Sequence, residues 1–463
     1  MRDEMQSSEQ RGDSQEAEKK GVYIRTFGCH MNEYDTQKLY KILEKEYRPV
    51  DAPEKADLVL INTCSVREKP EQKLYSMLGE MKPLRAQRPD MMIGVCGCVA
   101  QQEGERILKN ARGVDFVFGT HNLSLVPSLI QLRKNGAPPQ AAVDYREEWE
   151  ELPLGFADHD PTRLGQAGHV TAFVSISRGC NKNCTYCIVP TTRGPEVSRS
   201  LEEIEREVRI AVHRGSKEIV LLGQTVNSYG LDLSPRMTFV KLLDRVAAIP
   251  GVERIRFTSP HPQEVRQDFI DFVVSNPKVC RHIHMPLQSG SDRVLRLMNR
   301  NYRRSKYLSI IEALKDRVPE MAITTDIIVG FPGETEEDFR QTLEVMELVQ
   351  FDNSYSYAFS PRPGTPAAEM EEALTQEQKL ERLQELQALQ EKLTDAKLNS
   401  WVGREAEVLV DNHNRLHENC FQGRISQNFV ANFLQPHEAV TLGSLVKVRI
   451  ADRKRFTLIA EPA

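Results

Sequence analysis

Three cysteines lie close together in the spacing C-x-x-x-C-x-x-C, formed by Cys180, Cys184 and Cys187, here called the central cysteines. Three thiolates from one short loop can bind three irons of a 4Fe–4S cluster and leave the fourth iron without a protein ligand. A zinc site needs a fourth Cys or His, and none follows within the loop; the nearest is His169, before the expected strand. The spacing therefore favours a catalytic iron–sulfur site over zinc or plain thiols.

A second set of cysteines falls where strands are expected to end. Apolar segments alternate with helical stretches in the first part of the chain, which predicts an α/β domain with a parallel sheet. The apolar segments are Val22–Thr26, Leu58–Asn62, Met92–Val95 and Val114–Phe118, and the helical stretches between them include Thr36–Lys45 and Gln72–Met81. Cys29 follows the first segment, Cys64 follows the second, and Cys96 and Cys98 end the third.

The carboxyl ends of parallel strands share one edge of a sheet, where such folds bind ligands. We therefore expect Cys29, Cys64 and Cys98, here called the amino-terminal cysteines, to converge at that edge. Cys98 is favoured over Cys96 because Cys96 still lies within the apolar run. The alternative is that these residues are small buried hydrophobes, which suits one or two cysteines better than three successive strand ends.

Length and composition describe a globular protein of several domains. The chain has 463 residues, which suggests about three domains, and its 40% hydrophobic and 27% charged residues are ordinary. Its nine cysteines come without an apolar signal segment, so we expect reduced thiols in a cytoplasm, where clustered cysteines bind metal more often than they pair. The net charge of −5 means that a nucleic-acid partner must be met by a local basic patch.

Six apolar segments recur in the middle of the chain, with helical patterns such as Ser200–Arg214 and Phe239–Ala248 between them. The segments are Thr171–Ile176, Glu218–Leu222, Arg254–Thr258, Arg281–Met285, Ile323–Val329 and Ser354–Phe359. This pattern predicts an open or partial (β/α)6 barrel with its chemistry at the carboxyl rim. The central cysteines follow the first of these strands, where that rim lies.

The expected organisation is a disordered tail (1–20), an α/β domain (21–137), a linker (138–165), the partial barrel (166–398) and a small β-barrel (399–463). A long helix should begin at Thr375, which forms a capping box with Gln378. Leucines at helical spacing should form its packing face: Leu380, Leu383, Leu386, Leu389 and Leu393.

The last segment alternates like the strands of a small barrel at Glu407–Val410, Leu445–Ile450 and Phe456–Ile459. It carries a basic spot, Arg453 to Arg455, with three possible stacking groups nearby in sequence: Phe421, Phe429 and Phe433. Small barrels of this kind can bind RNA. The alternative is a solvated charged turn on a structural barrel.

The central cysteines, with Tyr186 before the last thiol, resemble the cluster motif of radical S-adenosylmethionine (SAM) enzymes. Three further segments resemble the cysteine motifs of the methylthiotransferase amino-terminal domain, and the tail resembles the TRAM domain, an RNA-binding barrel. Those segments are Thr26–Asn32, Ile61–Glu68 and Gly97–Gln101. The resemblance runs from Gly21 onward and follows the domain order of the methylthiotransferase family.

Two phrases, Asn62–Lys69 and Ile188–Gly194, are most similar to family members that modify isopentenylated adenosine in tRNA. His30, Pro195 and Ser200 depart from the usual family sequence, which affects substrate detail rather than the cysteines. The resemblance implies an enzyme that adds a methylthio group to C2 of N6-isopentenyladenosine at position 37, next to the anticodon of tRNA.

The cofactors implied by the resemblance are two 4Fe–4S clusters and SAM. The cluster on the central cysteines would bind SAM through its open iron and split it to a 5′-deoxyadenosyl radical. The cluster on the amino-terminal cysteines would carry the sulfur that is methylated and delivered. The implied partners are tRNA, a low-potential electron donor and a sulfur source, with no membrane; a cytoplasmic monomer is expected.

Alternatives remain within and outside the enzyme class. The resemblance also admits threonylcarbamoyladenosine in tRNA, or an aspartate of a small-subunit ribosomal protein, as substrate. An electron-transfer protein would want four protein ligands for each cluster, and neither site shows a fourth in the sequence. An RNA-binding iron–sulfur scaffold would leave the large α/β part of the chain without a purpose.

Polar segments at the strand ends are candidates for the remaining SAM pocket. Glycine there allows close approach of the backbone to a ligand, and amide or hydroxyl side chains can bond it. The candidate residues are Gln224, Asn227, Gln288, Ser289, Asp326 and Phe331. The alternative is that they are ordinary turn and helix-cap residues.

Overall fold

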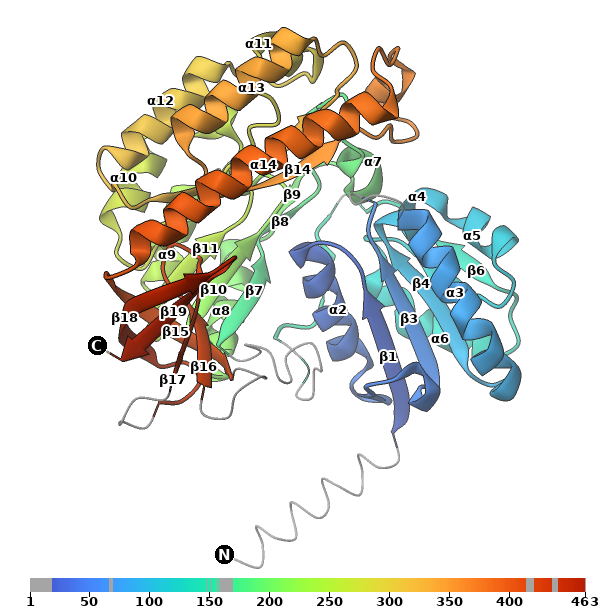
Figure 1. Ribbon diagram of the computed structural model, residues 1–463. Coiled ribbons are helices and arrows are strands. Elements are labelled where there is room, and N and C mark those ends of the chain that lie inside the picture. The colour runs from blue at the N-terminus through green and yellow to red at the C-terminus, as the bar shows by residue number, and fades with distance from the viewer. Residues whose placement is uncertain are drawn as a thin grey trace, which may run out of the picture. The chain divides into compact units, whose positions relative to one another are not determined.

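The computed structural model describes residues 19–65, 70–146, 148–150, 152–155, 157, 170–413, 420–434 and 440–462. Nearly all of the expected tail, part of the expected linker and the motif residues Val66–Lys69 lie outside them. The contacts divide the chain into two compact units (Figure 1). The amino-terminal unit comprises Met1–Leu164 and Thr191–Pro195, and the second unit comprises Gly165–Pro190 and Glu196–Ala463.

The amino-terminal unit is built on a six-stranded sheet in which every neighbouring pair is parallel, with the order β2-β1-β3-β4-β5-β6. The strands are β1 (Lys20–Thr26), β2 (Tyr47–Pro49), β3 (Leu58–Thr63), β4 (Met92–Gly97), β5 (Phe116–Phe118) and β6 (Gln140–Ala142). The predicted parallel α/β fold is confirmed. The edge strands β2 and β6 were not expected, since three residues are too short to show a pattern, and β6 lies within the residues assigned to the linker.

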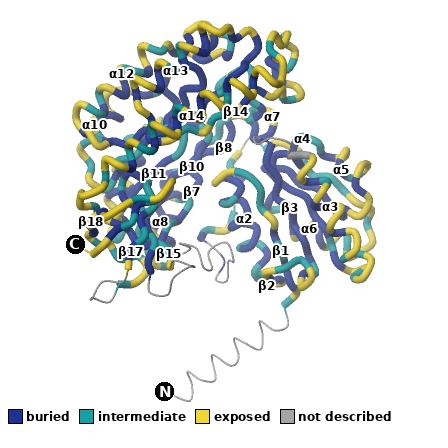
Figure 2. Tube along the Cα trace, viewed as in Figure 1, coloured by how far each residue is buried: buried dark blue, intermediate teal, exposed yellow. Residues whose placement is uncertain are grey.

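Helices cover both faces of this sheet, and its central strands β3, β4 and β5 are buried (Figure 2). Val59 and Ile61 of β3 pack with Leu74 of α3 on one face, while Leu58 and Leu60 pack in the cluster that holds Leu39 of α2 on the other. Alternate residues of a strand point to opposite faces, so β3 is apolar from Leu58 to Ile61. The helices are α2 (His30–Leu43), η1 (Pro53–Lys55), α3 (Pro70–Gln87), α4 (Cys98–Glu103), α5 (Glu105–Asn110), η2 (Leu123–Leu125) and α6 (Val126–Lys134).

The second unit contains six parallel strands in two sheets of three, with the orders β11-β10-β7 and β12-β13-β14. They are β7 (Thr171–Ser175), β10 (Glu218–Leu222), β11 (Arg254–Phe257), β12 (His282–His284), β13 (Ala322–Val329) and β14 (Asn353–Ala358). The predicted six strands of a partial barrel are confirmed. A short antiparallel pair, β8 (Ser177–Arg178) and β9 (Val197–Ser198), flanks the cysteine loop.

The elements between these strands are mostly helical. They are α7 (Val189–Arg193), α8 (Leu201–His213), η3 (Val226–Ser228), α9 (Phe239–Ala247), η4 (Pro262–Glu264), α10 (Gln267–Ser275), α11 (Asp292–Leu297), α12 (Arg304–Lys315), α13 (Glu336–Val349) and η5 (Pro366–Glu369). No helix in the described part of the chain is both long and apolar enough to cross a membrane.

Helix α14 (Gln376–Trp401) begins with the expected capping box of Thr375 and Gln378, and its predicted packing face is correct only in part. Leu386 is buried, Leu383, Leu389 and Leu393 are half-buried, and Leu380 is exposed. The buried face also carries polar residues with partners in the unit, such as Arg382 with Glu334 and Gln390 with the Phe351 carbonyl. The buried residues are Lys379, Arg382, Leu386, Gln390, Thr394 and Leu398.

The carboxyl-terminal strands close into a barrel, as predicted, in the order β15-β16-β17-β19-β18. They are β15 (Glu405–His413), β16 (Cys420–Arg424), β17 (Val430–Leu434), β18 (Leu445–Lys454) and β19 (Thr457–Pro462). Phe421 and Phe433 are buried in its core and Phe429 packs against it, so the proposed stacking role is wrong for the first two. The exposed aromatic ring is Phe456, 63% accessible, in the turn between β18 and β19.

The basic spot beside that turn is largely neutralised by α14. Arg453 donates to Asp395 Oδ2 at 2.6 Å and to Asn399 Oδ1 at 2.8 Å. Arg455 donates to Glu391 Oε1 at 3.0 Å. Each pair offsets one positive charge of the turn.

Two buried arginines of β11 attach the barrel to the parallel sheet. Arg254 donates to the carbonyls of Arg424 (2.6 Å) and Glu407 (2.8 Å). Arg256 donates to the carbonyls of Ile425 (2.9 Å) and Ser426 (3.1 Å) and, through Nε, to Glu218 Oε2 at 2.8 Å. The Arg256–Glu218 pair is almost fully buried, so its removal would leave a carboxylate without its partner.

We therefore predict that Arg256→Met lowers the free energy of unfolding of the second unit by about 3 kcal/mol. The exposed pair of Arg455 and Glu391 supplies the control, because Arg455→Met should cost less than about 1 kcal/mol. Urea unfolding followed by circular dichroism measures both. Equal shifts in the two variants would contradict a stabilising role for the buried pair.

Candidate functional site

The parallel register brings the ends of β1, β3 and β4 to one edge of the amino-terminal sheet. Thr26 pairs with Asn62, and Thr63 pairs with Gly97. Cys29 then precedes α2, Cys64 directly follows β3, and Cys98 opens α4. The structure thus brings together the three strand ends that the sequence singled out.

Gly28 allows a close approach of its backbone to Cys64 at this edge. Its φ is +116°, and an added Cβ would lie 2.4 Å from Cβ of Cys64. A larger residue would therefore push Cys29 away from Cys64. A hydrogen bond between these two thiols lowers the pKa of Cys29 well below its ordinary value, against the opposing effect of burial.

Thr63 and Asn32 tie the three cysteine segments to one another. The Thr63 hydroxyl donates to the carbonyl of Cys96 at 2.5 Å and accepts from the Val99 amide at 3.2 Å. Asn32 Nδ2 donates to the carbonyls of Phe27 (2.8 Å) and Thr63 (2.7 Å). These bonds join the residues next to Cys29, Cys64 and Cys98 in one buried network.

Arg193 enters this network from far along the chain. Its guanidinium is almost fully buried and donates to Asn32 Oδ1 and to Asp35 Oδ2, both at 2.8 Å. Burial raises the pKa of Cys98, while the charge of Arg193 and a hydrogen bond from it oppose that rise. Arg193 was not among the predicted site residues, although it lies in the segment Ile188–Gly194 quoted for the family resemblance.

Cys96 lies in a different environment from Cys98. It belongs to the apolar cluster that includes Leu58, Leu60 and Phe116, and burial raises its pKa well above the ordinary value. Its register partner in the ladder is Asn62. Cys96 therefore packs within the sheet, whereas Cys98 lies beyond the end of β4.

The central cysteines lie on a loop after β8. Cys180 Sγ accepts from the Lys182 amide at 3.4 Å and lies 3.5 Å from the Thr225 hydroxyl. Cys184 Sγ accepts from Arg300 Nη1 at 3.4 Å. Burial raises the pKa of Cys187 to about 12, so ionising this thiol requires a positive partner such as an iron ion.

The end of α11 holds this loop in place. Thr185 makes two hydrogen bonds there: its amide donates to the Met298 carbonyl at 3.1 Å and its hydroxyl donates to the Leu297 carbonyl at 3.0 Å. Asn299 Nδ2 donates to the Asn183 carbonyl at 2.7 Å. Arg300 is nearly fully buried, and no spacing in the sequence pointed to it.

Both sets of thiols have the ligand chemistry of a 4Fe–4S cluster. None of the six forms a disulfide; Cys29, Cys64 and Cys98 follow parallel strands, and the central cysteines follow β8. Among the described residues, no group of three or more Cys, His, Asp or Glu is arranged to hold a single metal ion. A cluster suits these sets better, because each thiolate binds a different iron and the sulfurs need not meet around one ion.

The predicted SAM-pocket residues differ in how they are engaged. Asn227 exchanges two hydrogen bonds with the backbone of His261, at 3.0 and 2.8 Å. Ser289 has no accessible surface and accepts from the Ser291 amide at 3.2 Å. Phe331 is buried, and the centroid of its ring lies 6.3 Å from that of Tyr186 in the cysteine loop. These three side chains have local structural contacts.

The other three predicted residues are Gln224, Asp326 and Gln288. Gln224 precedes Thr225, the neighbour of Cys180, and its buried Oε1 accepts no hydrogen bond. Asp326 is partly exposed and lies 3.2 Å from His284 Nε2. Gln288 is buried, has a φ of +71°, and its backbone bonds β13 at Asp326 and Ile328.

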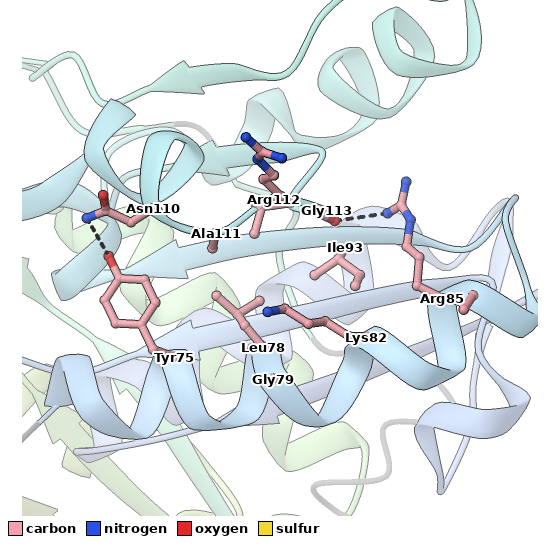
Figure 3. A pocket seen from close by; sticks show the side chains of 12 residues that line it. Tyr75, Leu78, Gly79, Lys82, Arg85, Ile93, Asn110, Ala111, Arg112 and Gly113 are labelled. Atoms are coloured by element: carbon pink, nitrogen blue, oxygen red, sulfur yellow. Dashed lines mark hydrogen bonds between the residues drawn. The ribbon is translucent and has the colours of Figure 1, made fainter.

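A hollow of about 670 Å³ in the amino-terminal unit lies away from the cysteines (Figure 3). It is lined by α3 and by the turn before β5, where Arg85 donates to the Gly113 carbonyl at 3.1 Å. Ile93 at its base is near the start of β4, whereas Cys98 follows the end of that strand. The hollow is therefore at the opposite edge of the sheet from the site.

Comparisons with known proteins identify both units. The family model described as the Radical SAM superfamily matches residues 174–346, and that of the Uncharacterized protein family UPF0004 matches residues 21–119. Curated relatives named tRNA-2-methylthio-N(6)-dimethylallyladenosine synthase align over nearly the full length. That of Acetivibrio thermocellus is 43% identical over 98% of this chain and 94% of its own, and that of Geotalea uraniireducens is 45% identical over 95% and 98%.

Solved structures share the fold at low identity. A radical S-adenosylmethionine methyltransferase from Kitasatospora setae, with cobalamin and a 4Fe–4S cluster bound, aligns with a TM-score of 0.55. Its identity is 14%, over 76% of this chain and 74% of its own. The cobalamin-dependent radical enzyme OxsB aligns with a TM-score of 0.52 at 12% identity, over 81% of this chain and 56% of its own.

We predict that Cys98→Ala removes one of two iron–sulfur clusters, whereas Cys96→Ala keeps both. Cys98 lies at the shared edge with Cys29 and Cys64, while Cys96 packs in the apolar cluster. Iron and acid-labile sulfide analysis after anaerobic reconstitution measures the difference. Loss of a cluster from Cys96→Ala alone would reverse the assignment.

We also predict that iodoacetamide modifies Cys29 of the cluster-free protein at lower pH than Cys98. The thiolate is the reactive form, and the pKa of Cys29 is lowered while that of Cys98 is raised. The modification rate of Cys29 should therefore begin to rise with pH below the ordinary thiol range, and that of Cys98 above it. Peptide mass spectrometry across a pH series measures both; coincident profiles would contradict the pKa shift.

Proposed function

Because the chain belongs to the tRNA-2-methylthio-N6-dimethylallyladenosine synthase family, we propose that it adds a methylthio group to C2 of N6-dimethylallyladenosine at position 37 of tRNA. The observation that carries the proposal is the presence of two sets of three cysteines, one set in each unit. One set follows the parallel strands β1, β3 and β4, and the other lies on the loop after β8. A reaction that needs both a radical and a sulfur atom suits two such sites.

The chain is a transferase, and its cofactors are two 4Fe–4S clusters and SAM. When bound, these groups supply the electron, the radical and the sulfur for the reaction. We propose that the central cysteines hold the cluster that binds SAM and that the amino-terminal cysteines hold the other. Three thiolates in each set leave one iron open to a ligand that is not a protein side chain.

The residues around the central cysteines fix the loop and its charge. Leu297 to Arg300 hold the loop by backbone and side-chain bonds, and Tyr186 packs on Phe331. Arg300 places a buried positive charge beside Cys184, which offsets the negative charge of bound thiolates. Among the candidates for SAM contact, we propose Gln224, which lies next to Thr225, the neighbour of Cys180, and Asp326, which is partly exposed, before the others.

The substrate is tRNA, and the terminal barrel is the part we propose for RNA contact. Phe456 is exposed beside Arg455 in the turn between β18 and β19, where a base could stack. We propose a low-potential electron donor and a sulfur source as further partners, since SAM cleavage consumes an electron and each product gains a sulfur atom. The monomeric state and the cytoplasmic location stay predictions.

We predict that the reconstituted protein, given SAM, dithionite and tRNA carrying N6-dimethylallyladenosine, produces the 2-methylthio nucleoside. The tRNA is digested and its nucleosides are analysed by mass spectrometry. Cys184→Ala should abolish 5′-deoxyadenosine and product, because it removes a ligand of the SAM-binding cluster. Cys98→Ala should abolish product while 5′-deoxyadenosine still forms.

Formation of 5′-deoxyadenosine without any change in the nucleoside would leave the radical chemistry in place and overturn the substrate. Absence of 5′-deoxyadenosine from protein with both clusters would overturn the radical SAM activity itself. Matched tRNA that lacks the dimethylallyl group is the control for recognition of that group.

A further inference from the structure

The short segment Thr191–Pro195 belongs to the amino-terminal unit, although the residues on both sides of it belong to the second unit. Residues up to Pro190, including the central cysteines, and residues from Glu196 onward belong to the second unit, whereas Thr191–Pro195 belong to the amino-terminal unit. Backbone contacts anchor the segment there: the Thr120 hydroxyl donates to the Thr192 carbonyl at 2.7 Å, and the Tyr145 hydroxyl donates to the Thr191 carbonyl. The segment therefore presents a side chain to the amino-terminal unit.

Gly194 makes this course of the backbone possible. Its φ is +71°, and an added Cβ would lie 3.2 Å from Cε1 of His121. A residue with a side chain would be strained and crowded there. The turn at Gly194 directly follows Arg193, so the direction of the arginine is set by a position that favours glycine.

Arg193 contacts residues close in sequence to Cys29 and, through them, residues next to Cys64 and Cys98. One nitrogen, Nη2, donates at 2.8 Å both to Asn32 and to Asp35, which are three and six residues after Cys29. Asn32 in turn holds the carbonyl of Thr63, the residue before Cys64. The Thr63 hydroxyl accepts from the amides of Val99 and Ala100, which follow Cys98. One cation is thus connected to all three cysteine segments.

The charge of Arg193 acts on the thiols as well as on the network. It acts on both Cys29 and Cys98, and Asp35 offsets part of it through an ion pair that is almost buried. A buried cation beside a cluster favours the reduced form, which carries one more negative charge, and charge and hydrogen bonds near the sulfurs set cluster potentials.

We propose that Arg193 is a positioning residue for the second cluster, which orders the segments of Cys29, Cys64 and Cys98 and raises the reduction potential of the cluster they hold. Asp35 opposes Arg193 and lowers that potential. The inference rests on the proposed function only in taking these cysteines as ligands. Arg193 lies only six positions after Cys187, the last of the central cysteines, yet its side chain acts at the amino-terminal cysteines.

Two variants should shift the potential in opposite directions. Arg193→Gln removes the charge but keeps an amide that can donate to Asn32. The equilibrium constant for reduction of the second cluster should therefore fall at least tenfold, which lowers its midpoint potential by at least about 59 mV for one electron. Asp35→Asn leaves the charge of Arg193 unopposed and should raise the potential. Arg193→Lys keeps the charge, so its midpoint potential should differ from that of the unsubstituted protein by less than about 59 mV.

The measurement is a redox titration of the reconstituted full chain, followed by the electron paramagnetic resonance signal of each cluster. Arg133→Gln is the control, because Arg133 pairs with buried Asp115 in the same unit, which Arg85 also binds. It should leave both clusters and both potentials unchanged. Iron content and SAM cleavage report whether the first cluster is intact in every variant.

Unchanged potentials in Arg193→Gln and Asp35→Asn, or shifts in the same direction, would overturn the proposal, since general loosening of the fold would affect both alike. Loss of the second cluster from Arg193→Gln, with the first retained and Arg133→Gln intact, would support the ordering role. None of these readings needs tRNA. A protein with both clusters and the expected shifts that modifies no tRNA would therefore overturn the substrate and leave the role of Arg193 standing.

Discussion

The parallel register of β1, β3 and β4 is the constraint on which the amino-terminal site depends. Parallel pairing aligns Thr26 with Asn62 and Thr63 with Gly97, so the chain leaves three neighbouring strands at one edge. A shift of one residue in this ladder would move a thiol from the edge into the sheet and turn its side chain to the other face. The apolar packing on both faces of the sheet thus fixes the strand register, and the register fixes the spacing of the strand ends that carry the amino-terminal cysteines.

Electrostatics gives the two sites a common design. Each set of cysteines has one almost buried arginine, Arg193 for the amino-terminal set and Arg300 for the central set. Burial raises the pKa of Cys98 and of Cys187, so both sites oppose thiolate formation until positive charge is present. Each arginine supplies part of that charge in a fixed position, and bound iron supplies the rest.

The sequence was sufficient where a local pattern determined the structure. Apolar segments that recur between helical patterns located the six strands of the second unit, and the spacing of Cys180, Cys184 and Cys187 indicated a cluster before any fold was known. It was insufficient where partners are distant in sequence. Arg193 and Asn32 are 161 residues apart, and the polar buried face of α14 depends on its packing against β14. Leucine spacing on α14 gave only part of the packing face, because charged and amide residues of the helix also have buried partners.

The pairing of Arg453 and Arg455 with α14 bears on how RNA affinity would respond to salt. Cations that meet phosphates release condensed counterions, which makes binding fall steeply as salt is added. These two arginines already have carboxylate partners in Asp395 and Glu391, so a phosphate arriving at the turn exchanges one anion for another. The turn would then add little to the salt dependence of tRNA binding. Its contribution would come from a base stacked on Phe456, a contact that ionic strength barely changes.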